Sequence, residues 1–114
     1  VEQAKASQRA IVISERLVST ETIRQYPERT VIPGFRVSHV VHLPFSAHPS
    51  SVYGVYDFDK AHIKKYADAS KTPQGLEEYL DQYVYGVKDH WSYLEAMGGM
   101  KHLNSLVADP ILGY

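Results

Sequence analysis

The chain has 114 residues, which is enough for one domain and too few for two independent cores. Hydrophobic residues make up 44% of it and charged residues 22%, a balance that excludes disordered, collagen-like and coiled-coil proteins. The formal net charge of −1 argues against a nucleic-acid partner, and the absence of cysteine excludes disulfides, thiolate metal sites and a cysteine nucleophile.

The chain opens with helix-forming residues at 2–9, followed by the apolar run Ala10 to Ile13. Consecutive β-branched residues without polar alternation predict a strand that is buried on both faces, as in a parallel sheet. A short helix is then expected over residues 21–25, because Ser19 offers a capping hydroxyl and Pro27 must end the helix.

Two further extended segments and a long loop come next. Thr30 to Ile32 is predicted to be extended and to run into a turn at Pro33-Gly34. The alternation of apolar and mixed residues from Phe35 to Leu43 predicts a strand with one apolar face. Residues 44–57 form an irregular loop that carries several aromatic residues, so we expect it to be packed and to be the best place for a site.

The rest of the chain is predicted to be helical. Asp59, Thr72 and Asp89 are each placed to cap the start of a helix. Gly86 is placed to end the second helix in a left-handed conformation, and Gly98-Gly99 is placed to end the third. The expected helices run over residues 59–70, 73–85 and 89–97, with a last turn or two over 100–107.

The histidines raise the question of a metal site. His39 and His42, three apart on a strand, point to opposite faces and make a poor ligand pair. Asp59 and His62 lie one helical turn apart and could share a ligand, but a cap carboxylate and a surface imidazole are the favoured interpretation. We therefore expect no metal site in the densest grouping, which comprises His39, His42, His48, Asp57, Asp59 and His62.

The loop offers the candidate substrate-binding residues His48, Ser50 and Tyr53. A histidine among hydroxyls could act as a base, but no orienting carboxylate is implied by the sequence. The simpler interpretation of His48 is a turn histidine that bonds to the backbone. Glycine-rich phosphate loops, the GxSxG elbow and the HExxH motif are absent, and the tyrosines are expected to be half-buried with solvated hydroxyls.

Three stretches of the sequence resemble one family when they are taken together in order. They are AIVISERLVS, RTVIPGFRVSHVVHLPFSAHPSSVYGVYDFD and YADASKTPQGLEEYLDQYVYGVKDHWSYLEAMG. This order resembles the C-terminal part of the A (alpha) subunit of family I CoA-transferases, of the glutaconate and 3-oxoacid type. The most specific elements are IPGF, AHP and Y-D-x-D, although Ser46 stands where the family pattern has a glycine.

The resemblance implies an α/β fold, with part of an open, mainly parallel sheet and a helical C-terminal layer. It implies transfer of CoA from an acyl-CoA to a carboxylic acid through a glutamyl-CoA intermediate. The glutamate nucleophile belongs to the B subunit or half of such enzymes, so no catalytic residue is expected here. Coenzyme A is then a substrate of the full enzyme, no cofactor is bound permanently, and a hetero-oligomer with the beta subunit is expected.

We expect residues 1–114 to be the C-terminal portion of a longer alpha subunit, because the chain opens at Val1 and within helix-forming residues. Since no apolar run is long enough to cross a bilayer, no membrane association and a cytoplasmic location are expected. Two alternatives remain open from the sequence. One is a related CoA-thioester hydrolase, and the other is a non-catalytic domain that binds a partner through its aromatic loop.

Overall fold

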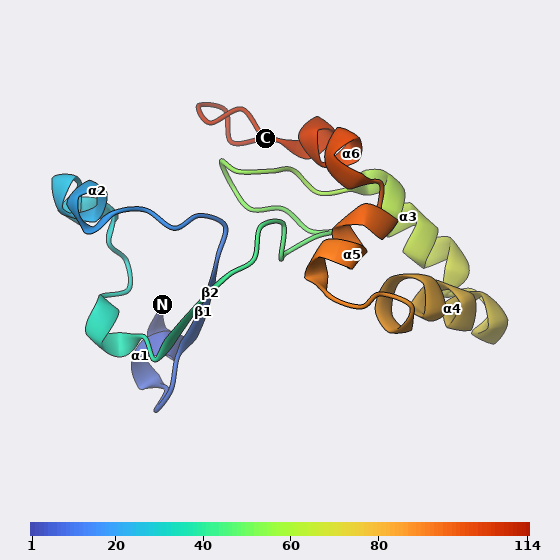
Figure 1. Cartoon of the computed structure of the whole chain (residues 1–114), viewed down its shortest axis with the longest axis horizontal. Coiled ribbons are helices and arrows are strands. Elements are labelled where there is room, and N and C mark those ends of the chain that lie inside the picture. The colour runs from blue at the N-terminus through green and yellow to red at the C-terminus, as the bar shows by residue number, and fades with distance from the viewer. The chain divides into compact units, whose positions relative to one another are not determined.

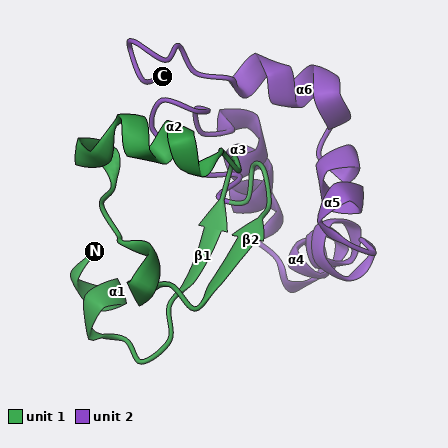
Figure 2. Ribbon diagram, turned by 60° about the vertical axis from the view of Figure 1, so that its left-hand side comes forward, with its two compact units in different colours: residues 1–46 green, residues 47–114 purple.

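The computed structural model describes all 114 residues and divides into two compact units. Figure 1 follows the chain from end to end, and Figure 2 shows the first unit, residues 1–46, in green and the second, residues 47–114, in purple. None of the helices combines the length and the apolar character that crossing a membrane requires.

The first unit is built on two short strands. β1 and β2 pair in parallel, with Ile11 beside His39 and Ser14 beside His42 (Figure 2). This pairing confirms the predicted parallel sheet and the α/β class. The elements of this unit are α1 (Glu2–Ala6), β1 (Ile11–Ser14), α2 (Thr20–Gln25), the 3-10 turns Pro27–Arg29 and Gly34–Arg36, and β2 (His39–His42).

The predicted helix at 21–25 is confirmed as α2, and the hydroxyl of Ser19 accepts a hydrogen bond from the Thr22 amide at 3.2 Å. The expected strands are longer than the observed ones. Residues 30–32 belong to no strand, and the predicted strand over 35–43 is confirmed only at 39–42. The reason is a 3-10 turn, in which the Arg36 amide donates to the Pro33 carbonyl at 3.0 Å and ends the extended run.

The sheet of the first unit is open on both faces. Ile11 and Ile13 of β1 are 67% and 55% exposed, and Val40 of β2 is 58% exposed. Ala10 is the one buried hydrophobic residue of this unit. The expectation that β1 is buried on both faces is therefore wrong within this unit, because its own remaining segments leave both faces of the pair exposed.

The second unit is helical, and the three predicted caps are confirmed. Side-chain oxygens of Asp59, Thr72 and Asp89 accept hydrogen bonds from backbone amides three residues later, at 2.9, 3.0 and 2.8 Å. Gly98 and Gly99 have positive φ values of 131° and 65°, as expected where one helix ends and the next begins. The helices are α3 (Lys60–Ala69), α4 (Pro73–Leu80), the π-helical turn Asp81–Tyr85, α5 (His90–Ala96) and α6 (Gly99–Leu106).

The role predicted for Gly86 is wrong. Its φ is −81°, so it does not adopt the left-handed conformation. Its amide donates to the Asp81 carbonyl at 2.7 Å and closes a π-helical turn. A Cβ at this position would lie 2.2 Å from the same carbonyl oxygen. Glycine is required here because the carbonyl approaches closely, and not because φ is positive.

The loop that precedes α3 is part of the core of the second unit. Tyr56 is fully buried and forms isolated bridges with Val52 and with Val107, which follows α6. Its hydroxyl accepts a hydrogen bond from the Ala47 amide at 2.9 Å. The prediction that this loop is packed is confirmed, and the prediction that tyrosine hydroxyls are solvated is wrong for Tyr56. The other buried apolar residues of the unit are Tyr83, Leu94, Met97, Leu103 and Ala108.

Candidate functional site

The inner side of the loop carries His48, whose side chain has no exposed surface. Its Nδ1 lies 2.5 Å from the hydroxyl of Tyr93 on α5, and its Nε2 lies 3.0 Å from Oδ2 of Asp59. The prediction that this histidine bonds to the backbone is therefore wrong, and the orienting carboxylate that the sequence did not reveal is Asp59.

Asp59 joins three segments of the second unit through a single carboxylate. Oδ2 accepts from Nε2 of His48 and from Nε2 of His102 on α6, and Oδ1 accepts from the His62 amide at the start of α3. Burial acts to raise the pKa of Asp59, but the hydrogen bonds from His102, His48 and the His62 amide outweigh it and hold the pKa well below its ordinary value. Asp59 is therefore ionised at neutral pH.

The ionised carboxylate fixes the protons of the neighbouring groups, because it can only accept hydrogen bonds. Nε2 of His48 therefore donates to Asp59, and Nδ1 pairs with the Tyr93 hydroxyl. Burial raises the pKa of Tyr93 to about 12, so that hydroxyl keeps its proton and can donate. Both ring nitrogens of His48 are engaged inside the protein, and the ring in this position cannot act as a base on an external substrate.

His62 is also inside the protein. It is 4% exposed, its Nε2 lies 2.8 Å from the Tyr79 hydroxyl, and its ring meets those of His48 and Tyr83 edge to face at 4.9 and 4.7 Å. Burial, and then the neighbouring His48, lower its pKa. The expectation of a surface imidazole is wrong, because α3 directs the His62 side chain toward the other helices of the unit.

Two members of the cluster had no signal in the sequence. His102 and Tyr93 come from α6 and α5, 43 and 45 residues away from the residues they contact. Only the packing of the helices brings them to the loop. His39 and His42, by contrast, lie exposed on β2 in the first unit, and the carboxylate of Asp57 accepts from the Phe58 amide beside it.

The outer side of the loop carries the other two candidates. Ser50 is exposed, and Tyr53 is 83% exposed. The Tyr53 ring packs over the backbone of Gly113, where a Cβ would lie 2.3 Å from the ring, and the Gly54 amide donates to the Gly113 carbonyl at 3.3 Å. The loop therefore holds His48 inside and presents Ser50 and Tyr53 outside. Substrate binding by these three residues stays a prediction.

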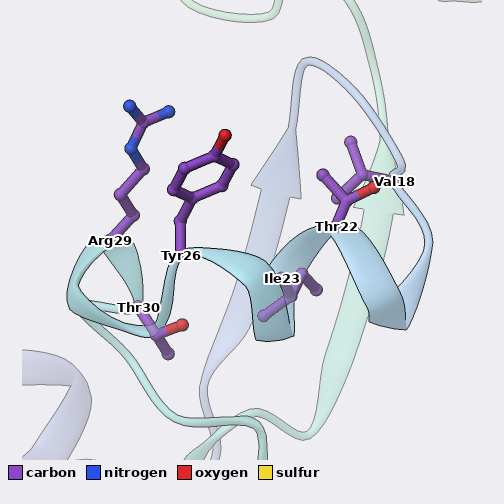
Figure 3. Close-up of a pocket in the computed structure, with 6 residues that line it drawn as sticks. All are labelled: Val18, Thr22, Ile23, Tyr26, Arg29 and Thr30. Atoms are coloured by element: carbon purple, nitrogen blue, oxygen red, sulfur yellow. The ribbon is translucent and has the colours of Figure 1, made fainter.

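The first unit has a pocket of its own along α2, which the sequence did not predict. Its volume is about 190 Å³, and Figure 3 shows Tyr26 and Arg29 at one end of it. The Arg29 guanidinium lies 4.6 Å from the centre of the Tyr26 ring. The pocket is mostly apolar and holds no pair of catalytic groups. Its lining is Val18, Thr22, Ile23, Tyr26, Arg29 and Thr30 (Figure 3).

Comparison with known proteins identifies relatives of the chain. It is 40% identical over 114 residues to the A subunit of glutaconate CoA-transferase from Acidaminococcus fermentans, and 47% identical over 105 residues to an uncharacterized protein of Archaeoglobus fulgidus. It is 28% identical over 88 residues to the cholesterol ring-cleaving hydrolase IpdA subunit of Rhodococcus jostii. These matches cover 100%, 92% and 75% of this chain, respectively. No family model matches.

A solved structure matches the chain to the same glutaconate enzyme. The crystal structure of glutaconate coenzyme A-transferase from Acidaminococcus fermentans matches 97% of this chain with a TM-score of 0.89 and 40% sequence identity. The chain spans only 35% of the glutaconate enzyme's A chain, 24% of the Archaeoglobus protein and 30% of the hydrolase subunit. The chain is thus homologous, over its full length, to about a third of the A chain of a family I CoA-transferase.

Proposed function

We propose that these residues are the C-terminal portion of the A subunit of a cytoplasmic CoA-transferase. The observation that carries the proposal is the match in sequence and structure to the glutaconate enzyme, at 40% identity and a TM-score of 0.89 over 97% of the chain. The protein would move CoA from an acyl-CoA to a carboxylic acid acceptor. The nucleophile lies outside this chain, on a B subunit or B half, and this portion alone is inactive.

The proposed reaction uses one glutamate carboxylate of the enzyme, the acyl-CoA and the acceptor acid, and it needs no other reactant. A glutamate carboxylate attacks the acyl-CoA thioester and gives a mixed anhydride and the CoA thiolate. The thiolate attacks the glutamyl carbonyl, which releases the donor acid and leaves a glutamyl-CoA thioester. The acceptor carboxylate repeats the two steps in reverse, so a new acyl-CoA leaves and the glutamate is regenerated.

The open sheet of the first unit supports the proposal that a larger subunit surrounds this chain. A parallel pair is normally buried on both faces, and an isolated two-stranded sheet is marginal in water. Ile11 and Val40 lie on opposite faces of the pair and are both more than half exposed. A groove of about 380 Å³ runs along this apolar surface and includes Ile32 and Val40. Further strands and helices of the same subunit would cover these faces.

In such a subunit, the loop would act as a contact surface. Ser50 and Tyr53 face outward and are proposed to contact the acyl group or the B subunit. His48 is proposed to contribute from within, because its bonds to Tyr93 and Asp59 fix the loop that presents them. The high exposure of Tyr53, an aromatic ring with a polar end, is typical of a contact surface.

A hydrolase is the second candidate, because the ring-cleaving hydrolase subunit matches 75% of the chain. The two candidates differ in what opens the glutamyl or acyl thioester, which is a carboxylic acid in a transferase and water in a hydrolase. The complete protein, together with its B partner, should release no free CoA from an acyl-CoA, and it should form the acceptor's thioester once an acceptor acid is added. Steady release of CoA without an acceptor would instead identify a hydrolase.

The third candidate, a domain that only binds a partner, is tested by the same assay. If the complete protein and its B partner neither transfer CoA nor release it, while still binding each other, the chain supplies an interaction surface without chemistry. If CoA is transferred, comparison of several short dicarboxylic and 3-oxo acids as acceptors would define the substrate class.

A further inference from the structure

The centre of the second unit holds a group of metal-ligand side chains to which the proposed reaction assigns no chemical step. Three buried residues each offer one ligand atom, and these atoms lie within 4.8 Å of one another. The residues are His48, Asp59 and His62. A fourth, His102, directs its Nε2 at the same carboxylate oxygen as His48. Buried clusters of imidazole and carboxylate are the ligands that zinc and similar divalent ions prefer in proteins.

The outer partners of these histidines also have the pattern of a metal site. A ligating imidazole commonly has its second nitrogen held by a hydrogen-bonding group, which fixes the ring. Tyr93 holds Nδ1 of His48 at 2.5 Å, and Tyr79 holds Nε2 of His62 at 2.8 Å. The second nitrogen of His48, Nε2, faces Asp59 inside the cluster.

An entry path reaches the cluster from the surface. A cavity of about 110 Å³ opens between the helices, and its walls include Asp59, His62 and His102. His102 is the most accessible of the four, with 31% of its side chain exposed. A hydrated cation could therefore approach through this opening and lose its waters to ligands that are already grouped. The full lining is Asp59, Ala61, His62, Lys65, Met97 and His102.

We propose that this cluster binds one divalent transition-metal ion, with Zn²⁺ as the best match to its chemistry. The ligands are His48, Asp59 and His62, and His102 lies beside them with its Nε2 on the Asp59 carboxylate. The hydrogen-bonded network is the metal-free form of the site. When the ion binds, the proton of His48 moves from Nε2 to Nδ1, where the Tyr93 hydroxyl turns from donor to acceptor.

The ligands must move closer together to hold the ion. Ligand atoms 2.0 to 2.2 Å from a tetrahedral zinc lie roughly 3.3 to 3.6 Å from one another. The spacing of up to 4.8 Å therefore has to contract by about 1.2 to 1.5 Å, which side-chain rotations on α3 and the loop can supply. Lys65 lines the same cavity, where its ammonium donates to the Tyr83 hydroxyl at 2.8 Å. Its positive charge opposes a cation, so its removal should tighten binding.

The test uses the complete protein that carries this chain, without a histidine tag and after treatment with a chelator. Zn²⁺ is titrated in competition with a chromophoric chelator, and Co²⁺ is titrated while visible absorption is recorded. We expect one equivalent of bound Zn²⁺ and the intense visible bands of tetrahedral Co²⁺. His62→Gln and Asp59→Asn should each lower the Zn²⁺ affinity about 100-fold or more, which exceeds the cost of losing a group that only hydrogen-bonds to a ligand. The asparagine can still cap α3, so this variant is expected to fold.

Two matched variants complete the experiment. His42→Gln removes an exposed histidine of β2 and should leave the affinity unchanged. Lys65→Met should increase the affinity, an effect that a purely structural hydrogen-bond network does not predict. Failure to bind either ion would overturn the proposal, and so would equal affinity in the wild type and in folded His62→Gln. Because binding is measured without substrate, neither result depends on whether the protein transfers CoA.

Discussion

Replacement of Asp59 by alanine tests how the second unit is held together. In the wild type this carboxylate accepts from His48, from His102 and from the amide that begins α3. Asp59→Ala removes the cap of α3, which costs about 1 kcal/mol. It also leaves the Nε2 of a fully buried His48 without a partner, which costs about 1 to 3 kcal/mol. His102 is partly exposed and can turn to water, so its loss adds little.

The expected loss of unfolding free energy is therefore about 2 to 4 kcal/mol, or roughly 14 to 28 °C in midpoint for a unit of this size. The assay is thermal unfolding followed by circular dichroism, with a metal chelator present so that ion binding does not contribute. Asp68→Ala is the matched control, because Asp68 lies on the same helix and pairs with Lys64 and Lys71 at the surface. Exposed pairs of this kind contribute little, so its midpoint should stay close to wild type. An Asp59→Ala midpoint as high as that of the control would refute the reasoning.

Three further changes test separate features. Gly86→Ala should lower the free energy of unfolding by about 1 to 3 kcal/mol, because the new Cβ would lie 2.2 Å from a carbonyl oxygen. Gly34→Ala, with open space around the new Cβ, should cost little. Equal denaturation midpoints for the two variants would contradict the account of the π-helical turn. Thr72→Ala should cost about 1 kcal/mol in urea unfolding through loss of a helix cap, and Thr72→Ser should restore most of it. Tyr53→Ala should lower the CoA-transfer rate of the complete enzyme without a change in its unfolding midpoint, whereas Tyr85→Ala, at a similarly exposed ring, should leave the rate unchanged.

Local signals in the sequence predicted the local structure well. The caps at Asp59, Thr72 and Asp89 depend on one side chain and an amide three residues later, so they could be recognised without tertiary information. The parallel strand pair followed from the apolar run before Ser14. The strand expected over 35–43 was too long, because the turn that follows Pro33 takes the chain out of the extended conformation.

The candidate site could be predicted only in part. The prediction that the loop is packed is confirmed, but its chemistry depends on contacts that no spacing reveals. His48 meets Asp59 from 11 residues away, and Tyr93 and His102 arrive from helices more than 40 residues further along the chain. The burial of His62 likewise depends on how α3 packs against Tyr79 and Tyr83. The residue types can be read from the sequence, and only the packing of the helices gives their grouping.

The most direct test of the central claim is detection of the covalent intermediate. The complete protein and its B partner are incubated with an acyl-CoA and then with borohydride, which reduces a glutamyl thioester to an alcohol. The account predicts acyl-CoA-dependent inactivation, with one glutamate of the B partner reduced in peptide mass spectra and every residue of this chain unchanged. Full CoA-transfer activity after borohydride, with no reduced glutamate, would contradict the claim that this chain is part of a CoA-transferase that works through glutamyl-CoA.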